Sequence, residues 1–252
     1  MVRGLDRFRE AFAAHSHQYA LIGGTACELL LGQVDLPFRA TKDLDIVLMS
    51  EMLDAVFATD FWRFVREGQY KVAESTGGTP RFYRFSAPQD ADFPSMIELF
   101  SSRPERLPPA SGQSLTPIPF EDAVSSLSAI LLDESYYAFL KSGVRLVEGV
   151  SVVGPEHLVA LKACAWLDLR ERKRKGRQID SRDIIKHFRD VFRLYQILDP
   201  APLRDIIPAV SRDMQRFLVE ARGETISLKN LGITNTSLDE VFTQLEKIYD
   251  AR

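Results

Sequence analysis

The sequence has little of three features that would define special classes of protein: cysteine, excess positive charge and long apolar runs. Two cysteines, Cys27 and Cys164, are too few for a disulfide framework and lie in apolar helical patterns, which suits a reducing compartment. No segment approaches the roughly 20 apolar residues that span a bilayer. Residues 1–12 contain acids and no apolar core of a signal peptide. We therefore expect a cytoplasmic protein without a membrane segment.

The chain lacks the positive net charge expected of a protein dedicated to nucleic acid. The formal net charge is −3, whereas nucleic-acid-binding domains usually show a strong basic excess. The basic residues that are present gather in one run, residues 170–177 (RERKRKGR). Two interpretations of this run stay open, a solvated helix end with its loop or a contact with phosphate or RNA.

What the sequence does have is the composition of a globular protein and a change of pattern midway. Apolar residues make up 45% and charged residues 27% of the 252 residues, which is enough for one large or two small domains. Apolar periodicity predicts the secondary structure. The expected strands are 19–22, 43–49, 81–85 and 95–100, with a strand pair in 144–153 around Gly149. The expected helices are 5–15, 25–31, a helix capped by Ser50 and running to about residue 66, 124–140, 155–173, 181–195, 202–222 and 237–249.

This pattern predicts an α/β (α+β) fold in two domains. Residues 1–154 would form a mixed sheet with flanking helices, and residues 155–252 would form a helical bundle. A proline-rich stretch, 104–119, interrupts the regular pattern within the first domain.

The first chemical signal is a pair of acids on the strand predicted for residues 43–49. Asp43 and Asp45 project to one side because side chains alternate along a strand, while Leu44 and Ile46 face the core. Two carboxylates held so close repel each other unless a cation lies between them, and a hard divalent cation is the usual solution. Magnesium also binds phosphate oxygens, so the pair is suited to a nucleoside triphosphate. Alone this signal is weak, because acid-x-acid pairs are common on protein surfaces.

The second signal lies upstream, where Gly23-Gly24-Thr25 joins the strand 19–22 to the next helix. Small residues at such a turn let backbone N–H groups approach a phosphate, and the helix N-terminus adds partial positive charge. A Gly-Gly turn alone would be an ordinary turn. Followed by the acidic strand, it predicts a phosphate cradle beside a metal site.

Two stretches carry a family resemblance, LIGGTACELLLG (21–32) and RATKDLDIVL (39–48). They resemble the nucleotidyltransferase superfamily signature, a Gly-Gly turn followed by an acid-x-acid strand. More narrowly, they are similar to the AbiEii/AbiGii-type toxin nucleotidyltransferases of bacterial abortive-infection and type IV toxin–antitoxin systems, whose loop commonly reads Arg-Ala-Thr-x-Asp-hydrophobe-Asp. Residues 124–137, 156–169 and 183–194 resemble later blocks of that family. The resemblance covers most of the chain and implies a nucleotidyltransferase-type sheet in the first domain.

The resemblance implies further site residues in the first domain. A third carboxylate is expected from a later strand and falls on Glu98, which would complete the metal set or take the proton from an attacking hydroxyl. Asp90 and Asp92 are near but lie in a turn bounded by prolines. Arg39 and Thr41 of the Arg-Ala-Thr loop would contribute to nucleotide binding.

In the second domain the resemblance implies that Lys162 binds the triphosphate as a point charge. From its position alone, Lys162 is equally a lysine at a helix edge. The next helix carries a polar stripe formed by Asp183, Lys186, His187 and Asp190. By resemblance Lys186 and His187 would bind nucleotide and an aspartate would act as base, with Asp183 and Asp190 both open. The alternative is a solvated face with a Lys186–Asp190 pair.

We therefore expect an enzyme that transfers a nucleoside monophosphate from an NTP to an acceptor hydroxyl, with magnesium or manganese as cofactor. By resemblance it would be the toxin of a toxin–antitoxin or phage-defence pair, with RNA (tRNA ends) or a protein as acceptor and a cognate antitoxin as partner. One alternative is a nucleotidyltransferase for a small molecule such as an antibiotic, although the basic run 170–177 does not suit a cationic substrate. Another is a catalytically inactive binding module, against which the intact Asp43, Asp45 and Glu98 argue.

Overall fold

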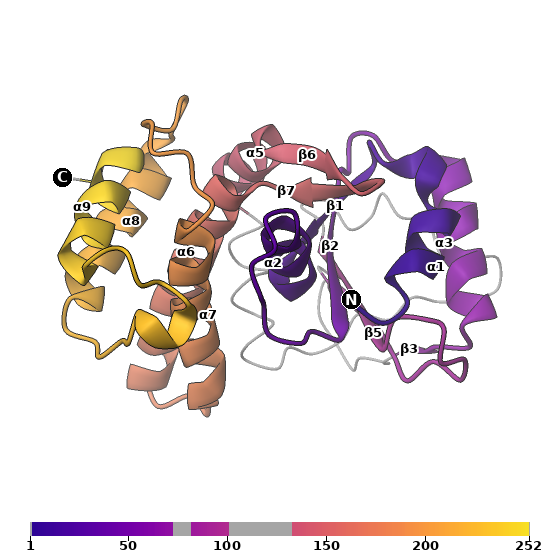
Figure 1. The fold of residues 1–252 in the computed structure, drawn as a ribbon. Helices are drawn as coiled ribbons and strands as arrows, with labels where there is room; N and C mark the ends of the chain where they lie inside the picture. Colours follow the sequence, from indigo (N-terminus) through magenta and orange to yellow (C-terminus); the bar gives the residue numbers. More distant parts are fainter. Residues whose placement is uncertain (1, 73–81, 101–132, 252) are drawn as a thin grey trace. The chain divides into compact units, whose positions relative to one another are not determined.

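The computed structural model describes residues 2–72, 82–100 and 133–251 (Figure 1). These residues form two compact units. The sheet unit comprises residues 2–72, 82–100 and 144–153, and the helical unit comprises residues 133–143 and 154–251. Residues 133–143 therefore belong with the later helices, whereas the predicted division at residue 154 assigned them to the first domain.

A mixed sheet of seven strands, counted over the described residues, is the framework of the sheet unit. Its strands are β1 (Tyr19–Ile22), β2 (Asp43–Leu48), β3 (Lys71–Val72), β4 (Phe82–Ser86), β5 (Met96–Phe100), β6 (Val144–Val147) and β7 (Val150–Val153). Their order is β3-β4-β5-β2-β1-β7-β6. Strand β2 pairs parallel with β5 and antiparallel with β1, and β1 pairs parallel with β7. The predicted mixed sheet is confirmed, with β2 at its centre, while the short β3 was not predicted.

Residue type explains the position of these strands. All four residues of β1 are buried, as expected of a strand covered on both faces. The hairpin formed by β6 and β7 turns through Glu148 and Gly149, whose φ angles are 47° and 82°. Two central residues with positive φ are the preferred connection of a two-residue hairpin, and the predicted strand pair around Gly149 is confirmed.

The helices of the sheet unit enclose a cluster of aromatic rings. They are α1 (Leu5–Ala11), the 3-10 helix η1 (Ala13–His15), α2 (Gly23–Gly32) and α3 (Ala55–Glu67). The rings that meet beneath α1 and α3 belong to Phe8, Phe12, Tyr19, Phe57, Phe61 and Phe64. Ring centroids separated by 4.5 Å between Phe8 and Phe12 and 5.5 Å between Phe12 and Phe64 lie in the range of favourable aromatic pairs.

Two helix starts differ from the prediction. Helix α2 begins at Gly23, two residues earlier than expected, so both glycines belong to its first turn. Helix α3 begins at Ala55, and the predicted cap Ser50 is wrong. The cap is Asp54, whose carboxylate accepts a hydrogen bond of 2.8 Å from the Phe57 N–H. Asp54 has an extended backbone and directly precedes the first residue of the helix. An acidic side chain at this position can accept hydrogen bonds from the first N–H groups of the helix.

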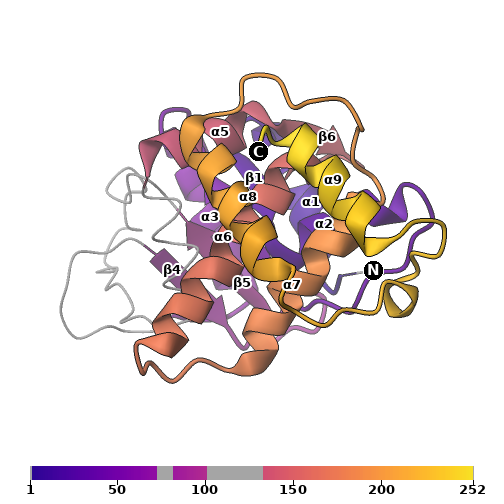
Figure 2. The same cartoon turned by 90° about the vertical axis from the view of Figure 1, so that its left-hand side faces the viewer.

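The helical unit is built around one long buried helix. Its elements are α5 (Glu134–Ser142), α6 (Pro155–Arg174), α7 (Ser181–Tyr195), α8 (Pro208–Ala221), the 3-10 helix η3 (Lys229–Leu231) and α9 (Leu238–Ile248). Helix α6 packs against both α7 and α8, and α8 packs against α9 (Figure 2). The predicted core stripe of α6 is confirmed, since its members are all inaccessible to solvent: Leu158, Leu161, Ala165 and Leu169.

Helix boundaries in this unit follow local hydrogen bonding. Helix α7 has the predicted bounds, and Ser237 caps α9 in a reciprocal capping box with Glu240. Helix α8 begins at Pro208, not at residue 202. The Leu203 N–H is bonded to the Ile248 carbonyl, and Asp205 has a φ of 56°, which a right-handed helix does not allow. Of the helix predicted for 124–140, residues 124–132 lie outside the described residues, as do Arg81 and the proline-rich stretch 104–119.

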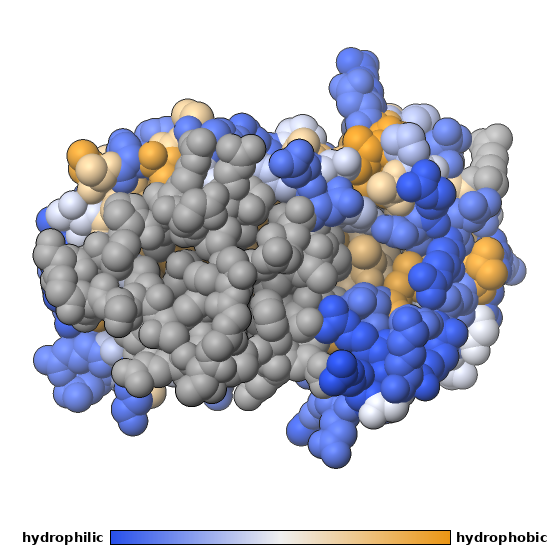
Figure 3. Space-filling view, turned by 180° about the vertical axis from the view of Figure 1, so that it is seen from behind, coloured by the Kyte–Doolittle hydropathy of each residue, from blue (hydrophilic) through white to orange (hydrophobic). Residues whose placement is uncertain are grey.

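The exposed apolar side chains are scattered. Seen from behind, the described surface is mainly hydrophilic with isolated hydrophobic residues (Figure 3). The large apolar side chains with the greatest exposure are Val34, Met52, Val56, Leu146, Ile185 and Val219. No helix in the described part of the chain combines the length and apolarity that a bilayer crossing requires.

Candidate active site

Strand β2 presents its two acids on one face. Asp43 and Asp45 are both half-buried, while the intervening Leu44 and the following Ile46 are buried. This is the alternation expected of a strand with a packed face and an accessible face. The predicted pair therefore lies on the central strand of the sheet, and α2 packs against this strand (Figure 1).

Gly23 brings the start of α2 against the second acid. Its φ is +69°, in the left-handed region, and a Cβ at this position would lie 1.6 Å from Oδ2 of Asp45. No other residue fits without moving the carboxylate. The backbone of the first helical turn, which carries the partial positive charge of a helix N-terminus, therefore lies directly on the Asp45 side chain.

The Arg-Ala-Thr loop closes over the same helix start. A Cβ on Gly24 would lie 2.6 Å from Oγ1 of Thr41 and 3.6 Å from Nη2 of Arg39. Thr25 is fully buried, and its hydroxyl donates a hydrogen bond of 2.7 Å to the Asp43 carbonyl. Thr25 thus ties α2 to β2, while Arg39 and Thr41 lie next to the first turn, as the predicted grouping requires.

Glu98 lies beside Asp45 because β5 pairs in register with β2, Asp45 opposite Glu98. The next strand, β4, places Arg84 opposite Glu98. The Arg84 guanidinium donates through Nη2 and Nε to Oε1 of Glu98 at 2.8 and 2.9 Å. Three strands therefore align an aspartate, a glutamate and an arginine in one row across the sheet.

The pKa of Glu98, in the middle of this row, is strongly raised. Burial raises the pKa of Glu98 to about 8, and the charge of Asp45 and a hydrogen bond with its carboxylate act in the same direction. Arg84 opposes the shift without cancelling it. Burial and a like charge both disfavour the ionised acid. Glu98 is therefore a carboxyl group that can hold or release a proton near neutral pH.

The oxygen donors of the sheet unit fit a magnesium ion delivered with a triphosphate. Among the described residues, no group of three or more His, Cys, Asp and Glu side chains is arranged to hold a metal. Two half-buried carboxylates, Asp43 and Asp45, remain accessible on one face. Magnesium commonly uses one or two protein carboxylates and completes its shell with water and phosphate oxygens. The third ligand role of Glu98 stays a prediction, since Arg84 holds one of its oxygens.

In the helical unit, Lys162 and Asp190 form a buried ion pair. Lys162 is 2% exposed and its Nζ lies 3.2 Å from Oδ2 of Asp190, which is inaccessible to solvent. Arg193 reaches the other oxygen, Oδ1, at 3.2 Å. Asp190 therefore lies between two cations. Lys162 is neither a surface lysine nor a lysine at a helix edge, and its predicted role in triphosphate binding stays a prediction.

The polar stripe of α7 divides into two parts. Lys186 pairs with Asp183 at 2.7 Å near the helix start, so the predicted Lys186–Asp190 pair is wrong. The reason is that Lys162 and Arg193 already hold both oxygens of Asp190. His187 is buried along with Asp190, whereas Asp183 and Lys186 are partly exposed. Of the two candidate aspartates, only Asp190 meets Lys162 in the described contacts.

Two arginines of these clusters, Arg84 and Arg193, were not predicted from the sequence. Arg84 alternates with buried Phe85 on a predicted strand, but its partner depends on how β4 pairs with β5. Arg193 lies three residues after Asp190, which is a detectable helical spacing. The interaction of Arg193 with Asp190 was within reach of sequence reasoning.

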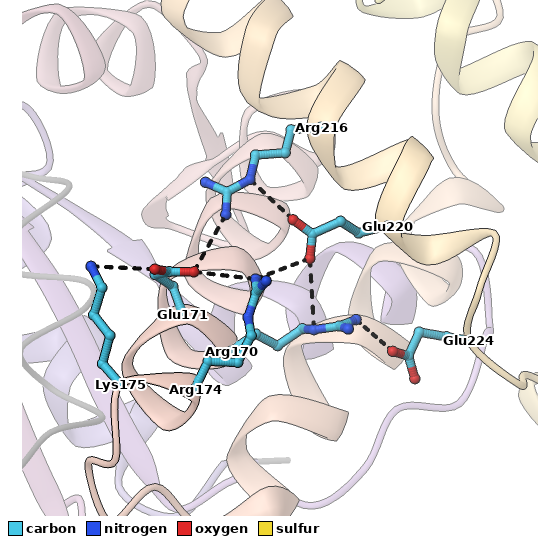
Figure 4. Close-up of polar contacts among 7 residues, drawn as sticks. All are labelled: Arg170, Glu171, Arg174, Lys175, Arg216, Glu220 and Glu224. Atoms are coloured by element: carbon cyan, nitrogen blue, oxygen red, sulfur yellow. Dashed lines mark hydrogen bonds and ion pairs between the residues drawn. The ribbon is translucent and has the colours of Figure 1, made fainter.

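The basic run 170–177 is largely neutralised by acids of its own unit (Figure 4). Arg170 contacts Glu224 at 2.5 Å and Glu220 at 3.8 Å. The further pairs of this network are Arg174–Glu171, Arg174–Glu220, Lys175–Glu171, Arg216–Glu171 and Arg216–Glu220. The geometry favours a solvated helix end with an ion-pair network.

A mixed sheet whose central strand carries Asp-x-Asp beside a glycine-built helix start is the arrangement expected of a nucleotidyltransferase. The family model described as "Nucleotidyl transferase AbiEii toxin, Type IV TA system" matches residues 7–246. The chain therefore belongs to the AbiEii nucleotidyltransferase toxin family.

Two other comparisons add less. The chain is similar to an antigenic nucleotidyltransferase-like protein from Paracoccidioides brasiliensis of known crystal structure, with 15% identity and a TM-score of 0.48 over 96% of this chain and 93% of that one. No curated protein matched the sequence.

Proposed function

We propose that this nucleotidyltransferase transfers a nucleoside monophosphate from an NTP to a hydroxyl of RNA or protein, with magnesium as cofactor. The observation that carries the proposal is the accessible pair Asp43 and Asp45 beside the Gly23 turn. The family membership supports a toxin role, in which a cognate antitoxin would be the partner.

The chemistry follows from the residues of the sheet unit. The acceptor oxygen forms a bond to the α-phosphorus, the bond from that phosphorus to the pyrophosphate oxygen breaks, and the hydroxyl proton leaves. Asp43 and Asp45 would hold magnesium, which when bound neutralises charge on the phosphates. The N–H groups at the start of α2 would hold phosphate oxygens, as helix N-termini commonly do.

Glu98 would accept the proton of the acceptor hydroxyl, and Arg84 would position Glu98. In its ionised form, a carboxylate with a pKa of about 8 is a stronger base than an ordinary glutamate. Arg84 holds Glu98 in place through two hydrogen bonds to one oxygen. Glu98 is therefore proposed as the group that accepts the acceptor's proton.

The test is a labelling experiment in which each NTP carries label at either the α- or the γ-phosphate. The protein is incubated with magnesium, total tRNA and a cell extract, and RNA and protein are separated. We expect label in one macromolecule from an α-labelled NTP and none from its γ-labelled form. Label arriving from the γ-position would show a kinase and contradict the proposal.

The control is the double variant Asp43→Ala with Asp45→Ala. It should lose transfer and, if the chain inhibits growth when expressed, lose growth inhibition as well. Toxicity that survives the double substitution would contradict the link between this site and the toxin role.

A further inference from the structure

A large pocket lies within the helical unit. None of its lining residues is close in sequence to the acids of β2. Its volume is about 990 Å³. It is lined by residues 166–174 of α6, residues 181–193 of α7 and residues 223–231. All the lining residues belong to the helical unit.

The lining is cationic. Its charged side chains are Arg170, Lys173, Arg174, Arg189 and Arg193, against one acid, Glu224. Glutamates already neutralise Arg170 and Arg174, as Figure 4 shows, and Asp190 holds Arg193. Within the described residues, Lys173 and Arg189 are in no ion pair, and Lys173 donates a hydrogen bond to the Ser181 hydroxyl. Lys173 also interacts electrostatically with Asp180. The pocket therefore offers the charge of Arg189 and a partly balanced Lys173, not a long cationic track.

The apolar part of the lining is aliphatic. Ile185 on α7 is 44% exposed, and Ile184, Ile226 and Leu231 are half-buried around the same pocket. These aliphatic side chains line the same pocket as Lys173 and Arg189. An apolar surface with charged residues at its rim can bind another molecule that has both apolar and oppositely charged groups.

The aromatic rings of the lining are covered. Trp166 is 2% exposed and Phe188 is 6% exposed. The two rings stack on each other at 5.3 Å, and Arg170 lies over the indole with its Cζ 4.3 Å from the ring centroid. Single-stranded nucleic acid is held by open ring faces and many phosphate contacts. This pocket offers neither.

We propose that this pocket binds an acidic amphipathic segment of a partner protein, with aliphatic side chains against Ile184 and Ile185 and carboxylates against Arg189 and Lys173. The ion pairs of Arg170 and Arg174 with glutamates show how carboxylates are already accommodated at this surface. The assignment is independent of the reaction proposed for the sheet unit.

The test is a selection of 16-residue peptides from a random displayed library on the full-length protein, with counter-selection on the Arg189→Glu variant. We expect the enriched peptides to carry two or more Asp or Glu residues beside aliphatic residues at helical spacing. Synthetic copies, measured by fluorescence anisotropy, should lose at least tenfold in affinity for Arg189→Glu and for Ile185→Glu.

Controls separate the pocket from general charge and folding effects. Lys247→Glu, an exposed charge reversal on α9, should leave peptide affinity unchanged within twofold. Replacing one peptide acid by lysine should weaken binding to the wild type and restore it to Arg189→Glu. Circular dichroism checks that the exposed substitutions leave the fold intact, and Arg189→Gln replaces any variant that does not fold.

Three results would overturn the proposal. One is a selection that enriches no acidic peptides, and another is peptide binding that the pocket variants leave unchanged. The third is binding of a labelled 12-nucleotide single-stranded RNA that Arg189→Glu abolishes in the absence of peptide binding. That outcome would assign the pocket to nucleic acid.

Discussion

Each unit contains a cluster of acids and arginine, and the two clusters balance charge in opposite ways. In the sheet unit, one arginine faces Glu98, whose neighbour Asp45 belongs to a half-buried acidic pair. In the helical unit, the single fully buried Asp190 lies between Lys162 and Arg193. An excess of acid on an accessible face attracts cations and protons, while the buried Asp190 is already held by two cations. The first arrangement suits metal-dependent chemistry, and the role of the second in the reaction stays a prediction.

The largest effect is expected for Lys162→Met in the helical cluster. The substitution removes one of the two cations that hold the buried Asp190 and leaves Arg193, so we expect a cost of about 3 kcal/mol. Urea unfolding of the variant should show this loss in the free energy of unfolding. A loss below about 1 kcal/mol would contradict the structural role of the pair. It would also strengthen the triphosphate-binding role that the resemblance implies for Lys162.

The next largest effect is expected for Gly23→Ala, which tests whether the sheet cluster is required for transfer. Gly23→Ala places a methyl group on the Asp45 carboxylate at a residue with φ of +69°, so we expect about 1–2 kcal/mol of destabilisation and at least a roughly hundredfold loss of transfer. Gly32→Ala is the matched control, because nothing lies within 4 Å of its Cβ. Alanine within a helix should leave transfer unchanged and raise stability by up to about 1 kcal/mol. Equal transfer activity of the two variants would show that Gly23 is not part of the active site.

The third effect is a pH dependence of stability that arises from Glu98. Its folded pKa of about 8 lies above the ordinary value of 4.5, so the unfolded chain loses its proton first as pH rises. The favourable contribution of protonated Glu98 is complete below about pH 4.5 and is lost as pH rises toward 8.

Glu98→Gln removes this dependence and can be tested by unfolding in urea with EDTA present. Relative to wild type, the variant should gain on the order of 2 kcal/mol between pH 5 and pH 8. Glu10→Gln, an exposed acid on α1, serves as the control and should show no such trend. Parallel pH profiles for the wild type and Glu98→Gln would mean that Glu98 is ionised in the folded protein.

The smallest effect is expected in the surface network of Figure 4. Arg174 is 55% exposed and pairs with Glu171 and Glu220. Exposed pairs contribute little, so Arg174→Gln should change the free energy of unfolding by no more than about 0.5 kcal/mol. A larger loss, measured by urea unfolding in low salt and in 0.5 M salt, would show that the network holds α6 and α8 together.

Much of the fold could be read from local patterns in the sequence. The bounds of β1 and α7 follow from apolar periodicity, and the alternation of Asp43 and Leu44 identifies the accessible face of β2. The Gly-Gly turn was recognised, although both glycines prove to be helical. These features depend on residues close in sequence, where period and turn chemistry are sufficient.

What could not be read depends on residues far apart in sequence. Arg84 meets Glu98 only because β4 and β5 pair in one particular register. Lys162 meets Asp190 because α6 packs against α7, and no helical spacing within α6 reveals it. The resemblance to the family named Glu98 and Lys162, but their partners and their burial required the packed structure.

In the proposed site, Asp43 and Asp45 bind an NTP together with magnesium. The most direct measurement is calorimetric titration of each NTP with magnesium into the wild type and into the Asp43→Asn, Asp45→Asn double variant, with near-ultraviolet circular dichroism to confirm an unchanged fold. We predict binding of at least one NTP to the wild type and a loss of about hundredfold or more in the variant. Equal binding to both proteins, or no binding of any NTP to the wild type, would contradict the account.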